Sequence, residues 1–261
     1  MKRLKVGRIP FGNLFPIFYI LERDFDCSDL HFVDGVPSML NKLLRNGEID
    51  LSPSSSIEYL NHKDLYTYLS GHSISSRGKA GSIFLFTQKL LSQMDGEIVQ
   101  VTNQSATSIG LLKVISRRFY NVRLKLVESS TPQRGNNPFL LIGDDALLQL
   151  KVENRGYKIY DLGELWYEHT GLPFVFALWI VRKDNIFGEK VKIFNNFKSN
   201  LDKAKDIALT NIRDLASLTP LKQFMTQEEI IEYWNKLDYD LTDKHLEGLK
   251  LYDSLLEEGD K

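Results

Sequence analysis

Short apolar runs alternate with helical patterns over the first two-thirds of the chain, and this alternation constrains the fold most strongly. Strands that alternate with helices are typical of a parallel sheet covered by helices. The run at residues 174–181 is continuously apolar, as expected of a strand buried on both faces. The sequence therefore predicts an α/β protein, with strands expected at residues 4–9, 48–51, 97–102, 138–142, 157–162 and 174–181.

Two capping boxes, in which a Ser or Thr side chain and a Glu three residues later satisfy each other's backbone N–H groups, are expected at helix starts. The pairs are Ser55 with Glu58 and Thr226 with Glu229. After Asn185 only helical patterns remain, with apolar residues at helical spacing. These C-terminal helices are assigned to packing and, as a second role, to a subunit contact in a homodimer.

Composition excludes several function classes. The chain has 261 residues, 43% hydrophobic and 26% charged, with a formal net charge of -1. Without a basic stripe, a nucleic-acid partner is not expected. The single cysteine and the five histidines show no metal-ligand spacing, so neither a metal nor a cofactor is expected. No apolar run is long enough to span a bilayer and no export signal is recognised, which favours a cytoplasmic protein without a membrane partner.

Small polar residues follow several of the expected strands, where open α/β sheets bind ligands. The turn 7–13 ends in Asn13, whose amide donates and accepts hydrogen bonds without charge. The turns at residues 54–56 and 105–108 begin helices, and a helix N-terminus attracts carboxylates or phosphates. Capping alone also explains Ser and Thr at such turns, so both interpretations stay open. A site for a small, polar, multiply anionic molecule is predicted, with candidate binding residues Ser55, Ser56, Ser105, Ala106, Thr107, Ser108 and Asp144.

A further segment, residues 74–85, contains two glycines and then Ser82 before an apolar run. Glycines of this kind suit a turn or a close approach of backbone to a ligand. Ser82 is expected at a crossover between two lobes, and 174–177 is expected to be the return crossover. Lobe one is therefore predicted to hold residues 1–84 and 176–261, and lobe two residues 85–175.

Taken in order, these segments resemble the chorismate dehydratases of the futalosine route to menaquinone. The resemblance implies a fold similar to periplasmic binding proteins of type II, with the substrate between two lobes. This chain departs from the family pattern at Phe11-Gly12, Leu14 and Gly81, which affects the expected pocket shape. The matching segments are residues 7–13, 35–41, 47–59, 74–82, 105–108, 141–147 and 170–177.

The resemblance also implies an activity, the elimination of water from chorismate by a hydro-lyase without a cofactor. It places the family's catalytic Asn on Asn13 and its catalytic Ser on Ser82. Neither side chain is a competent base at neutral pH, so the substrate's own enolpyruvyl carboxylate is the expected base, with Asp144 as the alternative. The alternative functions are 1,4-dihydroxy-6-naphthoate synthase of the same pathway, or a non-catalytic cytoplasmic protein that binds small anions.

Overall fold

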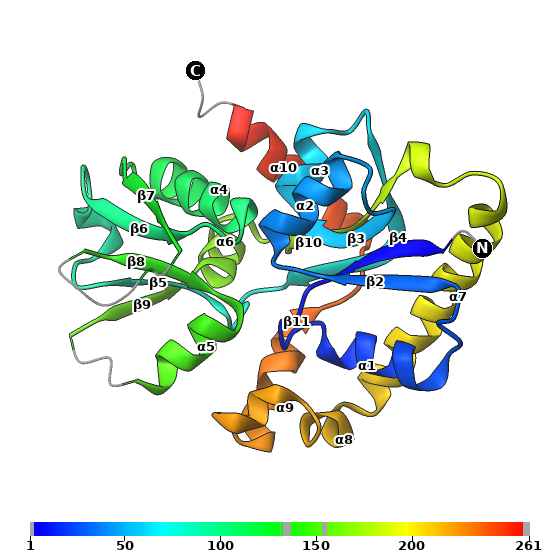
Figure 1. The fold of residues 1–261 in the computed structure, drawn as a ribbon. Coiled ribbons are helices and arrows are strands. Elements are labelled where there is room, and N and C mark those ends of the chain that lie inside the picture. Colours follow the sequence, from blue (N-terminus) through cyan, green and yellow to red (C-terminus); the bar gives the residue numbers. More distant parts are fainter. Residues whose placement is uncertain (1–2, 131, 133–136, 153–155, 258–261) are drawn as a thin grey trace. The chain divides into compact units, whose positions relative to one another are not determined.

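The structure is a computed structural model that describes residues 3–130, 132, 137–152 and 156–257 (Figure 1). The chain forms two compact units, each made of two separate stretches of sequence. Unit 1 holds residues 1–72 and 177–235, and unit 2 holds residues 73–176 and 236–261. The predicted α/β class is confirmed, because each unit is a sheet covered by helices.

The larger sheet has six strands in the order β11-β4-β10-β3-β1-β2. Strands β1, β2 and β3 belong to unit 1, the chain passes from one unit to the other within β4 and β10, and β11 belongs to unit 2. Strand β1 lies next to the edge strand β2 and runs parallel to both β2 and β3, whereas β10 runs antiparallel to β3. The strands are β1 (Leu4–Arg8), β2 (Leu30–Asp34), β3 (Leu51–Ser55), β4 (Tyr66–Ser76), β10 (Phe174–Arg182) and β11 (Leu237–Asp238).

Helices cover both faces of this sheet: α1 and α7 on one face, and α2 and α3 on the other (Figure 1). This arrangement follows from right-handed crossovers that leave β1 for β2 and then return past β1 to β3. The α-helices of unit 1 are α1 (Phe15–Asp24), α2 (Pro37–Arg45), α3 (Ser56–Asn61), α7 (Glu189–Thr210), α8 (Ile212–Ala216) and α9 (Gln227–Lys236). The 3-10 turn η3 (Lys183–Asn185) lies between β10 and α7, and η4 (Pro220–Gln223) lies between α8 and α9.

The sheet of unit 2 has five strands in the order β7-β6-β8-β5-β9. Strand β6 runs parallel to β7 and β8, and β5 runs antiparallel to β8 and β9. Because β6 and β1 lie in different sheets, the expectation that residues 97–102 and 4–9 belong to different sheets is confirmed. The strands are β5 (Ile83–Thr87), β6 (Ile98–Thr102), β7 (Lys125–Ser129), β8 (Phe139–Ile142) and β9 (Lys158–Asp161).

Helices α4 and α6 lie on one face of this second sheet and α5 on the other (Figure 1). The α5 side encloses a cluster of buried residues, in which the rings of Phe86 and Phe139 stack 4.8 Å apart. A single π-helical turn, η2 (Ile115–Phe119), extends α4. The helices are α4 (Ala106–Val114), α5 (Gly143–Lys151), α6 (Leu162–Thr170), α10 (Asp243–Glu257) and the 3-10 turn η1 (Leu91–Gln93).

The C-terminal segment belongs to unit 2, and this corrects the expectation that residues 236–261 pack in lobe one. Tyr252 on α10 is fully buried, with its ring 6.1 Å from that of Trp166 and 4.9 Å from that of Phe174. Its hydroxyl donates to the Thr107 carbonyl oxygen at 3.0 Å. Helical periodicity predicts that α10 packs against the rest of the protein, and the contacts of Tyr252 show that it packs in unit 2.

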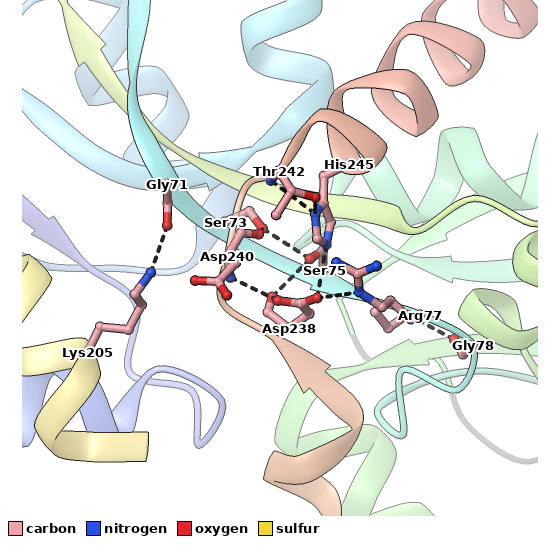
Figure 2. A network of polar contacts seen from close by, with 11 residues as sticks. Gly71, Ser73, Ser75, Arg77, Gly78, Lys205, Asp238, Asp240, Thr242 and His245 are labelled. Atoms are coloured by element: carbon pink, nitrogen blue, oxygen red, sulfur yellow. Dashed lines mark hydrogen bonds and ion pairs between the residues drawn. The ribbon is translucent and has the colours of Figure 1, made fainter. Parts of the chain in front are cut away.

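Polar contacts attach the chain before α10 to the second half of β4 (Figure 2). The Ser75 hydroxyl donates to the Asp238 carbonyl oxygen at 2.9 Å, and Arg77 Nε donates to the Asp238 carboxylate at 2.8 Å. The Thr242 backbone N–H donates to Nδ1 of buried His245, and Nε2 of the same ring lies 3.2 Å from the Asp238 carboxylate. Residues 73–76 therefore belong to unit 2, and the first boundary falls at 72/73 rather than at 84/85.

One expected strand is displaced along the sequence. Residues 48–51 were expected to form it, but β3 begins at Leu51. Asp50 is buried just before the strand, where its carboxylate accepts from Lys190 Nζ at 2.8 Å and from the Lys5 backbone N–H at 2.8 Å. Strand pairing with β1 is in register at Leu51, opposite Val6, and the Asp50 N–H just before it donates to the Lys5 carbonyl oxygen at 2.9 Å.

Candidate functional site

Asn13 and Ser55 lie at the same edge of the sheet in unit 1. Strand β1 lies between β2 and β3, so one crossover leads to the strand on one side of β1 and the next leads to the strand on its other side. Open α/β sheets bind ligands at such a switch point. Asn13 follows β1 and is half-buried, and Ser55 is the last residue of β3. The predicted strand-end positions of these two residues are confirmed.

The turn that carries Asn13 is held by residues distant in sequence. Trp234 Nε1 donates to the Gly12 carbonyl oxygen at 2.9 Å. A Cβ added to Gly12 would lie 2.5 Å from Leu221 Cδ1, so a side chain at this position would force Leu221 to shift. These contacts explain why this chain has glycine immediately before Asn13.

Ser55 does not form the expected capping box. Its Oγ accepts from Asn41 Nδ2 at 2.7 Å, and no side chain caps α3. Glu58, which is only 4% exposed, instead accepts from Arg45 Nε at 3.0 Å and from the Tyr66 hydroxyl at 2.8 Å. A buried carboxylate needs such donors, and these outcompete the solvent-exposed geometry of a capping box.

Ser54 and Ser56 flank Ser55, and all three serines are buried. The Ser54 hydroxyl and the Asn41 amide oxygen are fully buried, and neither has a hydrogen-bond partner among the residues that the structure describes. Ser54 and Asn41 thus add polar groups beside Ser55. Sequence reasoning did not select Asn41 for the site, because nothing local distinguishes it from other polar helix residues.

In unit 2, Ser82, Ser105 and Asp144 lie at one edge of the second sheet. Strand β6 separates β7 from β8, which creates a second switch point, and Ser105 and Asp144 follow β6 and β8. Ser82 precedes β5, whose first residue is opposite the last residue of β8. The Gly143 N–H donates to the Ser82 carbonyl oxygen at 2.8 Å. Ser82 therefore lies immediately before a strand of unit 2 and not at the chain's passage between units.

The turn before α4 has a conventional cap. Ser105 Oγ accepts from the Ser108 N–H at 3.3 Å and lies 3.1 Å from Ser108 Oγ. Thr107 is fully buried, whereas Ala106 is exposed. The capping interpretation is confirmed for Ser105, and ligand binding by this turn stays a prediction.

Asp144 lies in the first turn of α5 and is half-exposed. The helix begins at Gly143, so Asp144 lies inside the helix and is not its N-cap. Gly143 has a φ of 57°, which glycine adopts without strain, and it turns the chain directly from β8 into the helix.

The two edges share a chemistry. Both offer hydroxyls and strand-end backbone groups, with an amide at the edge in unit 1 and a carboxylate at the edge in unit 2. Such groups bind the carboxylates and hydroxyls of a small polar molecule. Within the described ranges, no three His, Cys, Asp or Glu side chains are grouped as metal ligands. Among the same residues, every helix is too short or too polar to cross a membrane.

The fold defines a class of protein. The crystal structure of protein AF1704 from Archaeoglobus fulgidus is similar, with a TM-score of 0.81, 18% identity and coverage of 99% of this chain and 98% of that one. The alkanesulfonate-binding protein SsuA from Xanthomonas axonopodis pv. citri is similar with a TM-score of 0.71, 10% identity, and coverage of 100% and 94%. The chain thus has the fold of the periplasmic binding proteins.

Sequence relatives then identify the family. The model of the menaquinone biosynthesis family matches residues 4–258, and the chain belongs to this family. A chorismate dehydratase from Thermus thermophilus is 30% identical over 204 residues, 71% of this chain and 72% of that protein. A chorismate dehydratase from Campylobacter jejuni is 30% identical over 226 residues, 79% of this chain and 84% of that protein.

Proposed function

We propose that this protein is a chorismate dehydratase, a hydro-lyase that converts chorismate into 3-[(1-carboxyvinyl)oxy]benzoate and water in the futalosine route. The observation that carries the proposal is the 30% identity to two chorismate dehydratases over most of this chain. Polar residues at both strand-end edges support it, because chorismate carries two carboxylates and a hydroxyl. A cytoplasmic location and a homodimer stay predictions from the sequence.

The reaction breaks one C–H bond and one C–O bond on neighbouring carbons of the substrate ring, and the ring itself stays intact. A base takes the proton from the ring carbon that bears the enolpyruvyl ether, and the electron pair left behind completes the aromatic ring. The neighbouring hydroxyl leaves and takes up a proton, so that one water is released. Aromatisation drives the reaction, and the protein must orient the substrate and assist the leaving hydroxyl.

Asn13 and Ser82 are the proposed catalytic residues. Both are neutral, so they act as hydrogen-bond partners that orient the hydroxyl and stabilise charge as it develops. The substrate's enolpyruvyl carboxylate is the proposed base. Asp144, half-exposed at the edge in unit 2, is the alternative.

The proposed carboxylate-binding groups are the turns that contain Ser55 and Ser56 in unit 1 and residues 105–108 in unit 2. In the second turn the exposed Ala106 leaves the backbone approachable, and Ser105 fixes its conformation. Replacing Thr107 by Val keeps the shape and removes a hydroxyl, so a contact with substrate would cost about 0.5–3 kcal/mol of binding free energy. Unchanged affinity in a folded T107V protein would leave this turn only its capping role.

Incubation of the purified protein with chorismate tests the activity, with ultraviolet spectra and product mass as readouts. We expect an aromatic product lighter than chorismate by one water. N13A and S82A should each bind chorismate but lose roughly 100- to 1000-fold in rate. The double variant should lose less than the product of the two factors, because both residues act on one reaction.

Matched controls are available on the surface. Ser38 and Asn195 are exposed, and S38A and N195A should keep normal turnover. Wild-type protein that binds chorismate but forms no product would reject the dehydratase and favour a binding protein. Normal turnover in either N13A or S82A would remove that residue from the mechanism.

A further inference from the structure

Asp161 has two sets of hydrogen-bond donors. It is the last residue of β9 and only 6% exposed. As the N-cap of α6 it accepts from the Gly163 N–H at 2.9 Å and the Glu164 N–H at 3.2 Å. The same carboxylate also accepts from the Ala80 N–H at 3.0 Å and the Gly81 N–H at 2.7 Å. The second set belongs to the loop that leads directly into Ser82.

The residue type is explained by the loop rather than by the helix. A Ser, Thr or Asn caps a helix with a single oxygen. Four donors from two segments require two oxygens with several lone pairs, which a carboxylate has. Burial raises the pKa of Asp161 above its ordinary value, and the four backbone N–H groups limit this rise by favouring the ionised form. The free energy lost by burying the carboxylate is offset by its hydrogen bonds to two segments of the chain.

Close packing presses the first turn of α6 onto the same loop. A Cβ added to Gly163 would lie 2.7 Å from both the Gly78 carbonyl oxygen and Ser76 Oγ. The loop itself contains two glycines at positive φ, Gly78 at 109° and Gly81 at 75°. Glycine gives the backbone freedom at these positions, so the conformation of the loop depends on its anchors.

We infer that Asp161 is a positioning residue for Ser82: its carboxylate fixes the loop 78–81 and thereby the place of the Ser82 hydroxyl at the sheet edge. This inference rests on the proposed function. Register adds a second restraint, because Asp161 is paired with Phe84 across the sheet, two residues after Ser82. A catalytic group must be held within about 0.5 Å of its working position, and a misplacement of about 1 Å costs on the order of 100-fold.

The test uses D161S, because serine keeps a capping oxygen for α6 but is too short and has too few oxygens to hold Ala80 and Gly81. D161N is the second variant, since it keeps the shape and replaces one acceptor by a donor. The control is T226A, which removes a cap of the same kind from α9, where Thr226 Oγ1 accepts from the Glu229 N–H at 3.2 Å. Thr226 has no part in the proposed site.

We expect D161S and D161N to lower kcat for chorismate by roughly 10- to 100-fold and to change KM by less than about threefold. T226A should leave both constants within about twofold of wild type. In an S82A background, the change D161S should cost less than about threefold, because the residue it positions is already gone. Hydrogen exchange of the Ala80 and Gly81 amides should accelerate in D161S.

Three results would overturn the inference: kcat in D161S as high as in T226A, an equal loss of rate in the presence and absence of the Ser82 hydroxyl, or unchanged amide exchange. A wild-type protein without dehydratase activity would reject the proposed function instead. The amide exchange would still report whether Asp161 holds the loop, so the two failures are distinguishable.

Discussion

Replacing Gly248 by Ala should destabilise the protein although alanine is the better helix former. Gly248 lies in the middle of α10, where glycine costs about 1 kcal/mol relative to alanine. Helix propensity alone therefore predicts that G248A is more stable than wild type. The packing of α10 in unit 2 predicts the opposite sign.

The magnitude follows from one close approach. A Cβ on Gly248 would lie 2.1 Å from the Pro173 carbonyl oxygen, a distance that real Cβ atoms do not show. Either the helix or Pro173 must withdraw by about 1 Å, and overpacking of this kind costs about 1–3 kcal/mol. Tyr252 is one helical turn further on, so a shift of α10 also weakens its hydrogen bond to Thr107, for about 0.5–1.5 kcal/mol. After the gain in propensity, we expect a net loss of about 2 kcal/mol.

Urea unfolding measures this difference, and thermal unfolding should show a midpoint lowered by about 4–8 °C. The control is S254A on the exposed face of the same helix, which should stabilise by a few tenths of a kcal/mol. If G248A is as stable as wild type or more stable, α10 does not approach Pro173. Its assignment to unit 2 would then fail.

Three more predictions concern buried polar contacts. Burial opposes ionisation of Asp238, but hydrogen bonds from neighbouring side chains outweigh it and hold the pKa of this carboxyl below its usual range. The ionised carboxylate therefore stabilises the fold above about pH 4, and this stabilisation is lost as the pH falls through the folded-state pKa. Urea unfolding across pH should therefore show D238N less stable than wild type at neutral pH, with a flatter loss in acid; parallel curves would contradict this. Y252F should lose about 1–2 kcal/mol of unfolding free energy, since it leaves the Thr107 carbonyl without that donor, and an unchanged urea midpoint would argue against the bond. W234F should lose about 1–3 kcal/mol of unfolding free energy, because it removes the indole N–H that donates to the Gly12 carbonyl oxygen. A W234F protein as stable as wild type would refute this role of the bond.

Sequence reasoning recovered the parts of the fold that depend on local patterns. The alternation of strands and helices indicated the α/β class, and the capping box of Thr226 and Glu229 forms as expected, because both residues lie at the start of one helix and neither is buried. The same pattern failed at Ser55 and Glu58. There Glu58 is buried against residues from another helix and strand, which no local pattern reveals.

The candidate site was predicted to a similar extent. The rule that ligands bind at strand ends selected Asn13 and Ser105, and the family resemblance selected Ser82; the structure places each at the edge of a sheet. Asp161 was missed, although its position before a helix marks it as a cap. Its further bonds reach residues 80 and 81 positions earlier, and such long-range contacts leave no trace in local sequence.

The two-part composition of unit 2 has a consequence for the order in which the chain can fold during synthesis. Domains generally fold as units as the chain emerges from the ribosome. Most of unit 2 is made early, but the ring of Tyr252 that covers Trp166 and Phe174 arrives only after unit 1 has been translated. Until then these aromatic rings lack that cover, so nascent chains that stall before residue 252 should be substrates for chaperones, and released chains should not.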